Sequence, residues 1–109
     1  MTVPERLSIA KDTFAECIKT FEVKGEAYAS NQDSLSNFKR NAERLNMSMF
    51  QIWAVYFNKH VDSVNNAIAQ NPLTPVDKSE GLESRVTDLI NYAMLLKCLL
   101  IENQQSGKK

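Results

Sequence analysis

The sequence predicts an all-α protein of about four helices. Apolar residues recur at spacings of three and four over long stretches, which is the pattern of amphipathic helices. The 109 residues include only three glycines and three prolines, too few for the frequent turns of a β architecture. With 43% apolar and 24% charged residues, the composition is that of a globular protein. The length fits one domain over residues 1–109, with a core over about 4–103 and a flexible tail at 104–109.

The first helix is expected over about residues 4–28, with Pro4 in the first turn, where its missing N–H group is tolerated. Its apolar stripe consists of Leu7, Ala10, Phe14, Cys17 and Phe21. The same spacing then reaches Lys24 and Tyr28. The stripe therefore changes from apolar to polar while it stays on the face that looks at the core.

A polar connection at residues 30–32 precedes a short second helix, which Asp33 or Ser34 can cap. The apolar face of this helix consists of Leu35, Phe38, Ala42 and Leu45. Asn46 and Met47 close it. This part of the chain therefore predicts one short amphipathic helix.

Ser48 and Gln51 have the spacing of a capping box, which predicts the start of a third helix that runs to about Gln70. The residues expected to be buried on it at helical spacing are Phe50, Trp53, Phe57, Val64 and Ile68. Pro72 and Pro75 then break the pattern, because proline lacks the N–H donor that a helix needs.

The last helix is expected over about residues 80–103, with Ser79 as its cap. Its predicted core stripe is Leu82, Val86, Leu89, Ala93, Leu96 and Leu100, and it is flanked by Ile90, Leu99 and Ile101. One partner helix does not cover so wide an apolar arc. We therefore expect a second copy of the chain to complete the bundle in a homo-oligomer.

Charge and hydropathy exclude two classes of partner. The 13 basic and 13 acidic residues cancel, whereas binding to long nucleic acids needs clustered positive charge. No apolar run reaches the roughly 18 residues of a membrane span. Cys17 and Cys98 lie within apolar helical patterns and lack metal-type spacing. They are predicted to be buried, reduced thiols, which favours a cytoplasmic location.

Three groups of polar residues lie beside the predicted core stripes. They are Lys24, Tyr28, Asp33 and Asn37; then Tyr56, Lys59, His60 and Ser63; and finally Arg85, Asp88, Asn91 and Tyr92. Structural explanations exist for each group: a solvated Arg85–Asp88 ion pair, a hydrogen-bonded His60 at the core edge, or Asp33 as a helix cap. However, polar groups beside a core need partners, and their recurrence on three helices predicts an inter-helix cleft.

Such a cleft suits a small phosphorylated nucleotide. Lysine and arginine bind phosphate, aromatic rings stack on a base, and asparagine pairs with amide-like edges. The predicted ligand-binding residues are Lys24, Tyr28, Asn37, Lys59, His60, Arg85, Asn91 and Tyr92.

Four sequence elements together resemble small phage and prophage proteins of the MazG-like, nucleotide-modification-associated type. They are Lys24-x-x-x-Tyr28, Asp33-x-Leu35-x-Asn37-Phe38, Lys59-His60 and Arg85-x-x-Asp88-Leu89-x-Asn91-Tyr92. The resemblance spans about residues 14–101. It implies a MazG-like helical bundle that forms oligomers, in the host cytoplasm if a phage encodes it. It also implies a magnesium-dependent hydrolysis of nucleoside triphosphates to monophosphates and pyrophosphate, with Asp88 and His60 as catalytic residues.

The chain departs from the acidic motifs of that family. Asp88 matches the aspartate of the second motif, but Arg85 stands where its glutamate belongs, and no Glu-Glu-x-x-Glu element is present. Magnesium prefers oxygen ligands and needs one or two carboxylates. Asp88 and Asp33 are the predicted metal ligands, while Asp62 is expected to point to another face.

Three functions remain open on this evidence. The first is binding of a (d)NTP or related nucleotide between the helices, with or without hydrolysis. The second is a non-catalytic sponge that sequesters a cyclic or other nucleotide signal of host antiviral systems. The third is a helical adaptor or structural protein whose wide apolar last helix meets a partner.

Overall fold

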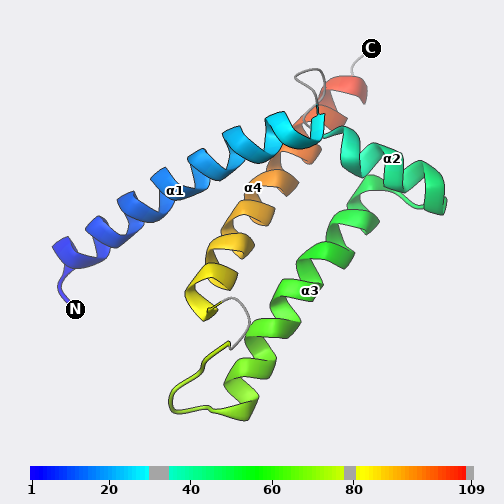
Figure 1. Ribbon diagram of the computed structural model, residues 1–109. Coiled ribbons are helices and arrows are strands. Elements are labelled where there is room, and N and C mark those ends of the chain that lie inside the picture. Colours follow the sequence, from blue (N-terminus) through cyan, green and yellow to red (C-terminus); the bar gives the residue numbers. More distant parts are fainter. Residues whose placement is uncertain (30–34, 78–80, 108–109) are drawn as a thin grey trace. The chain divides into compact units, whose positions relative to one another are not determined.

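The computed structural model describes residues 1–29, 35–77 and 81–107, and within these ranges all side chains except those of residues 23–29 and 107. These ranges contain four helices and no strand (Figure 1), which confirms the all-α prediction. None of the described helices has the length and hydropathy needed to cross a membrane. The chain divides into two compact units, Met1–Ser36 and Asn37–Lys109. The assignment of a single domain stays a prediction.

The first unit consists mainly of α1 (Val3–Ala29). A capping box at Thr2 and Glu5 starts this helix. The Thr2 amide donates to Glu5 Oε2 at 2.8 Å, and the Glu5 amide donates to Thr2 Oγ1 at 3.3 Å. These two bonds satisfy amides that an uncapped helix leaves without partners. The sequence analysis missed this Thr-x-x-Glu signal and relied on Pro4 alone.

The N-terminal half of the predicted α1 stripe is not buried. Leu7 is 55% exposed and Phe14 is 56% exposed, and Ala10 is exposed as well. Cys17 is buried and Phe21 is half-buried. The prediction that the whole stripe belongs to the core is therefore wrong over its first half, although the periodicity of the helix itself is as expected.

In the second unit, a short helix leads into a long one. α2 (Ser36–Leu45) ends at Asn46, which has a φ of 52°. The Met47 amide donates to the Ala42 carbonyl at 3.0 Å, and the Asn46 amide donates to the Glu43 carbonyl at 3.3 Å. This is a Schellman motif in which asparagine takes the left-handed position that glycine usually occupies.

α3 (Met49–Gln70) begins at the predicted capping box. The Gln51 amide donates to Ser48 Oγ at 3.1 Å, and the Ser48 amide donates to Gln51 Oε1 at 2.8 Å. The helix ends at Asn71, whose amide donates to the Ala67 carbonyl. Both predicted ends of this helix are therefore confirmed.

α2 is joined to both long helices of its unit. The ring of the buried Phe38 meets Tyr56 of α3 edge-on, with centroids 6.2 Å apart. Asn41 Nδ2 donates to the Tyr56 hydroxyl at 3.4 Å. Lys39 Nζ lies 2.6 Å from Glu102 Oε1 of α4 (Leu82–Gly107). These contacts place α2 at the C-terminal end of α4.

α4 starts after Gly81, whose φ of 84° is a conformation that favours glycine. The Gly81 carbonyl accepts the first helical bond, from the Arg85 amide at 3.3 Å. The predicted cap, Ser79, lies outside the described residues. The helix continues to Gly107, so residues 104–107 are helical and not the flexible tail that we expected.

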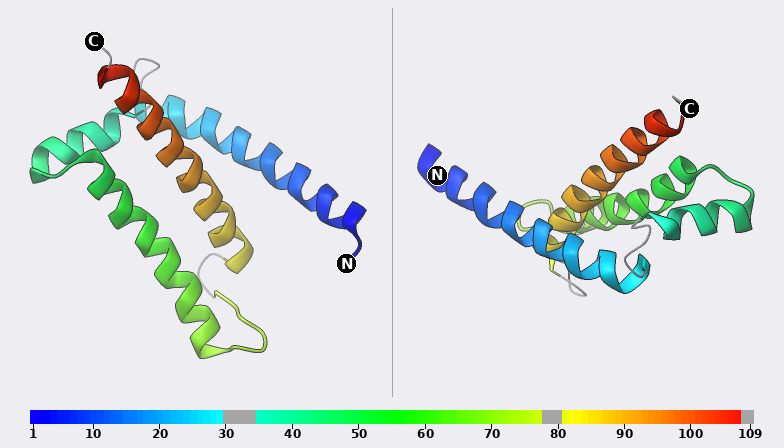
Figure 2. Two further views of the ribbon diagram at one scale, coloured as in Figure 1. Left: turned by 180° about the vertical axis from the view of Figure 1, so that it is seen from behind. Right: turned by 90° about the horizontal axis from the view of Figure 1, so that it is seen from above.

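α3 and α4 pack side by side and form the core of the second unit (Figures 1 and 2). Four residues of these helices are almost fully buried: Ile52 and Ala67 on α3, and Asn91 and Leu99 on α4. Cys98 is exposed, which contradicts its predicted burial.

The predicted α4 stripe is not the face that is most deeply buried. Val86 and Leu100 are 46% and 45% exposed, and Ala93 is exposed. The buried Leu99 and Asn91 lie on a different side of the helix. The prediction fails because α4 is apolar on two sides, and periodicity alone does not decide which side meets α3.

The capping box of α3 gives a test of local stability. We expect Ser48→Ala to lower the free energy of unfolding by about 1 kcal/mol, because the Gln51 amide loses its acceptor. Chemical denaturation followed by circular dichroism measures the change. The control is Ser106→Ala, at an exposed position of α4, which we expect to change stability by less than about 0.5 kcal/mol. Equal effects of the two substitutions would contradict the capping role.

Candidate functional site

A histidine–aspartate pair lies between α3 and α4. His60 Nδ1 is 3.8 Å from Asp88 Oδ2, and both side chains are largely removed from solvent, with 15% and 26% exposure. The His60 ring also meets the Tyr92 ring, with centroids 5.1 Å apart and a tilt of 40°. A separation of 3.8 Å is too long for a hydrogen bond. The two groups are therefore neighbours that are not hydrogen-bonded to each other, and His60 Nδ1 has no hydrogen-bond partner among the described residues.

Two buried polar atoms of this region have no hydrogen-bond partner among the described residues. They are His60 Nδ1 and Asn91 Oδ1. Asn91 is only 7% exposed, and it lies three residues after Asp88, on the same side of α4. Unsatisfied buried polar atoms are uncommon in native proteins and frequently mark a bound water or a functional site.

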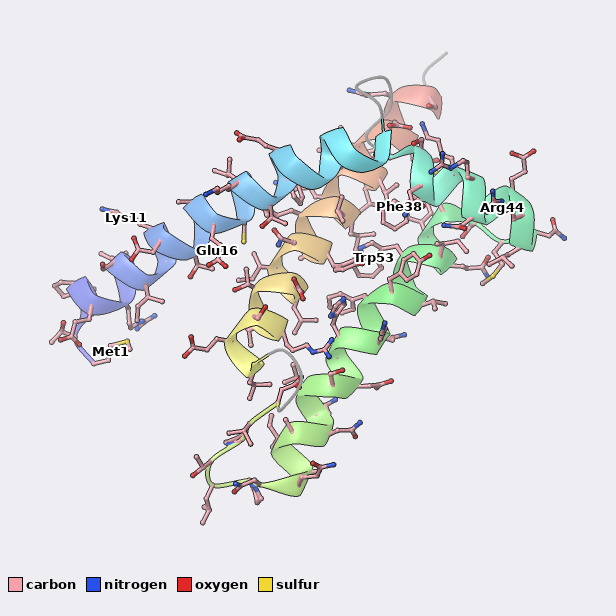
Figure 3. All side chains as sticks on the ribbon, in the orientation of Figure 1. Met1, Lys11, Glu16, Phe38, Arg44 and Trp53 are labelled. Carbon is pink, nitrogen blue, oxygen red and sulfur yellow. The ribbon has the colours of Figure 1, made fainter. Side chains whose placement is uncertain are left out.

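Aromatic side chains continue this region toward the N-terminal end of α3. Trp53 Nε1 donates to the Tyr92 carbonyl at 2.7 Å, a direct bond between α3 and α4. The Trp53 and Phe57 rings stack with centroids 4.6 Å apart. Trp53 projects from α3 toward α4 in Figure 3. The helix pair therefore has an aromatic end beside the His60–Asp88 pair.

An open cleft lies at the other end of the helix pair, where α3 ends and α4 begins. Its volume is about 530 Å³, within the range of small-molecule sites, roughly 300–1,000 Å³. The lining is mostly polar and consists of Ser63, Asn66, Ala67, Gln70, Asn71, Val76, Asp77 and Arg85. Ser63 follows His60 by three residues and Arg85 precedes Asp88 by three, so the cleft begins one helical turn from the pair.

An ion pair orients the arginine of the cleft. Arg85 Nε donates to Asp77 Oδ2 at 2.8 Å, and the two side chains are 14% and 11% exposed. The Gly81 amide donates to the Asp77 carbonyl at 3.1 Å, which fixes the backbone that carries this carboxylate. Breaking a partly buried pair of this kind leaves an uncompensated charge, so Arg85 is held in place on the cleft wall.

The structure brings together only part of the predicted site. His60, Asp88 and Tyr92 meet at the α3–α4 interface, Asn91 is buried one turn after Asp88, and Arg85 lies one turn before Asp88 on the cleft wall. Arg85 pairs with Asp77, and not with Asp88 as the sequence suggested.

The remaining predicted residues lie elsewhere or outside the described residues. Lys59 is exposed on α3. Asn37 is half-buried on α2, where Asn41 Nδ2 donates to its carbonyl at 3.0 Å and to its side-chain oxygen at 3.2 Å. Nothing is described for Asp33 or for the side chains of Lys24 and Tyr28. The ligand role of these five residues stays a prediction.

Sequence reasoning missed Asn66, Gln70 and Asp77. A signal for the first two was present, because Lys59, Ser63, Asn66 and Gln70 follow spacings of four, three and four. That spacing makes a polar stripe on α3. No local pattern pointed to Asp77, since its partner Arg85 is eight residues away across the start of α4.

The described residues do not make a magnesium site. No group of three histidine, cysteine, aspartate or glutamate side chains comes together within the described ranges. Asp88 is the carboxylate of the α3–α4 pair, and its neighbour is a nitrogen of His60, whereas magnesium prefers oxygen ligands. Asp33, the second predicted ligand, lies outside the described residues. We therefore derive no chemical step that runs through a metal ion.

Comparison with known proteins found no relative of this chain. No model of a known protein family matches the chain, and neither the curated proteins nor the solved structures contain a significant match.

The buried amide gives the second prediction. We expect Asn91→Leu to raise the free energy of unfolding by about 1 kcal/mol, because an unsatisfied buried oxygen is replaced by an apolar group of similar volume. Urea denaturation measures the effect. The control is Asn103→Leu, at an exposed position of the same helix. A loss of stability for Asn91→Leu would contradict the assignment and mean that Asn91 Oδ1 is hydrogen-bonded in solution.

Proposed function

We propose that this protein binds a small phosphorylated nucleotide in the cleft between the end of α3 and the start of α4. The observation that carries the proposal is the polar cleft of about 530 Å³ with Arg85 on its wall. Small-ligand sites combine a cavity of this size with a few polar groups that fix the ligand's orientation.

The phosphate end of the ligand belongs beside Arg85. A guanidinium group binds phosphate through charge-assisted hydrogen bonds, and Asp77 holds this one in a fixed orientation. Pre-orientation lowers the entropy that a side chain loses when a ligand binds. The exposed Lys59 lies near the middle of α3, one turn before Ser63, and adds positive charge to the same polar stripe.

The base belongs beside the side-chain amides of the cleft. Asn66 and Gln70 each offer a carbonyl oxygen and an NH₂ group, which match the donor and acceptor edges of a nucleobase.

The proposed activity is binding, and hydrolysis is not part of it. Among its described lining residues the cleft offers one carboxylate, Asp77, which is paired with Arg85, whereas metal-assisted hydrolysis needs an oxygen-rich metal site that activates water. Mono-, tri- and cyclic nucleotides share the phosphate and base chemistry used here. The proposal includes a role as a sponge that sequesters a nucleotide signal. It also includes a relationship to MazG-like proteins and a location in the cytoplasm of a phage's host.

A helical adaptor is the second candidate. The apolar side chains exposed on α1, among them Leu7, Phe14 and Ile18, favour it, because exposed apolar patches mark protein-interaction sites. Absence of binding to every nucleotide, in a chain that retains its helical content, would favour this candidate over the first.

Titration calorimetry tests nucleotide binding directly. The ligands are ATP, GTP, the four dNTPs, AMP and cyclic dinucleotides, each with and without magnesium. We expect at least one of them to bind with a Kd below about 10 μM, which corresponds to about 7 kcal/mol of binding free energy. If none binds at millimolar concentration, the proposal is wrong.

Variants of the cleft locate the site. We expect Arg85→Gln to weaken binding about 10- to 100-fold, because a charged hydrogen bond to phosphate is lost. Asn66→Ala is the second variant; it leaves the Arg85–Asp77 pair intact, and we expect a weakening of roughly 3- to 10-fold. The matched control is Arg40→Gln, at an exposed position of α2. Equal weakening by Arg40→Gln would mean that net charge, and not the cleft, binds the ligand.

A turnover assay separates binding from catalysis. The chain is incubated with each nucleotide that binds, in the presence of magnesium, and release of phosphate and pyrophosphate is measured. We expect no release above that of a sample without protein. Pyrophosphate release that is lost in Asp88→Asn would contradict the binding-only proposal and support a pyrophosphohydrolase.

A further inference from the structure

α4 carries a second apolar face besides the one that packs on α3. Its residues are Leu82, Val86, Leu89, Ala93, Leu96 and Leu100, and this set is called the outer seam. Val86, Ala93 and Leu100 are exposed, and the three remaining leucines are half-buried. The buried Asn91 lies on the opposite side of α4 from this seam, and the buried Leu99 lies on the flank of the seam. The exposed part of the outer seam, with Val86, Ala93 and Leu100, is therefore an apolar face that packing on α3 leaves uncovered.

The spacing of the outer seam is that of a coiled coil. Its residues alternate by four and three, which gives two interleaved seven-residue repeats. Leu82, Leu89 and Leu96 occupy one repeat position, and Val86, Ala93 and Leu100 occupy the other. A strict seven-residue repeat keeps one narrow seam turned toward a partner helix. The seam spans about 27 Å along the helix, so its partner is a helix of similar length.

The seam is complementary to itself when two copies run antiparallel. In that arrangement one repeat position of a helix meets the other position of its partner. The resulting layers are Leu82 with Leu100, Val86 with Leu96, and Leu89 with Ala93, each occurring twice. The large Leu89 is set against the small Ala93 at the centre, and a layer of two alanines does not arise. All six seam residues find a partner in this single register.

The charges beside the seam fit the same register. Glu83 and Lys97 are exposed on one flank of α4 and lie seven residues to either side of Ile90. In an antiparallel pair centred near Ile90, Glu83 of each copy faces Lys97 of the second copy. Facing charges on the flanks of a coiled coil set the partner and its direction. Two opposite-charge pairs therefore favour the register that the apolar layers require.

We infer that the outer seam of α4 is a homodimer interface, in which a second copy of this chain packs antiparallel along α4. The interface is isologous, because the same residues serve both copies. None of the seam residues is among the described residues that line the proposed nucleotide cleft, and Arg85, which does line it, lies on the flank of the seam, three residues after Leu82. One short helix pair is smaller than a standard protein interface of about 1,600 Å². Dimer formation is therefore expected to depend on protein concentration.

Sedimentation equilibrium of the full chain over a concentration series tests the interface. We expect a monomer–dimer equilibrium for the unaltered chain. Ala93→Glu introduces a charge at the centre of the seam, and we expect it to weaken the dimer about 100-fold or more. The matched control is Cys98→Glu, at an exposed position of the same helix outside the seam, which should leave the dimer intact. Circular dichroism checks that each variant keeps its helical content.

A charge exchange tests the antiparallel register. Glu83→Lys alone and Lys97→Glu alone each place like charges opposite one another, and we expect each to weaken the dimer about tenfold. The double variant Glu83→Lys/Lys97→Glu restores opposite charges across the interface. We expect its dimer constant to return to within about threefold of the original.

Three results would overturn the inference. The unaltered chain could remain monomeric at every concentration, as it would if another segment of the same chain covered the seam. Cys98→Glu could disrupt the dimer as strongly as Ala93→Glu. The double charge variant could be no better than the single variants, which would exclude the antiparallel register. Nucleotide binding is measured on the same samples, so failure of the interface and failure of the cleft are told apart.

Discussion

The second unit depends on how α3 and α4 bury polar groups between them. Trp53 of α3 donates its indole N–H to the backbone carbonyl of Tyr92 at 2.7 Å, although that carbonyl also belongs to a helix. The bond joins residues 39 apart in sequence and fixes which sides of the two helices meet. His60 and Asp88 then lie partly buried at the interface, where reduced access of water makes electrostatic interactions stronger. The position of the candidate site is therefore determined by which sides of α3 and α4 pack together.

The helices were predictable, and the faces that they bury were not. Ser48 and Gln51 predict the start of α3, because a capping box is formed by residues close together in the sequence. The local sequence of α4 does not determine which of its sides is buried. Both the Leu99 side and the Leu89 side are apolar, so a pattern of apolar residues fits either side. For the candidate site, the sequence predicted that His60, Asp88 and Tyr92 lie in one inter-helix cleft. It did not find Asp77, because the pair with Arg85 exists only once the chain has turned at Gly81.

The two apolar sides of α4 have different consequences. The side turned to α3 also carries polar residues, and two buried atoms of the helix pair stay unsatisfied, His60 Nδ1 of α3 and Asn91 Oδ1 of α4. Proteins keep such atoms where function requires them, because they lower stability. The outer seam carries only apolar residues, with charges on its flank. One helix can thus line a ligand site on one side and hold a second copy on the other, with no residue shared between the two tasks.

The central claim is that a nucleotide occupies the cleft between α3 and α4. The most direct measurement is a two-dimensional ¹H–¹⁵N NMR titration of the full chain with the best-binding nucleotide. Trp53 is the only tryptophan of the chain, so its indole resonance is unambiguous, and the side-chain amides of Asn66 and Gln70 report on the cleft wall. If the nucleotide lies in the cleft, these amides and Arg85 Nε shift first and most, with a smaller shift at Trp53. Shifts confined to α1, or no shift at saturating nucleotide, would contradict the central claim.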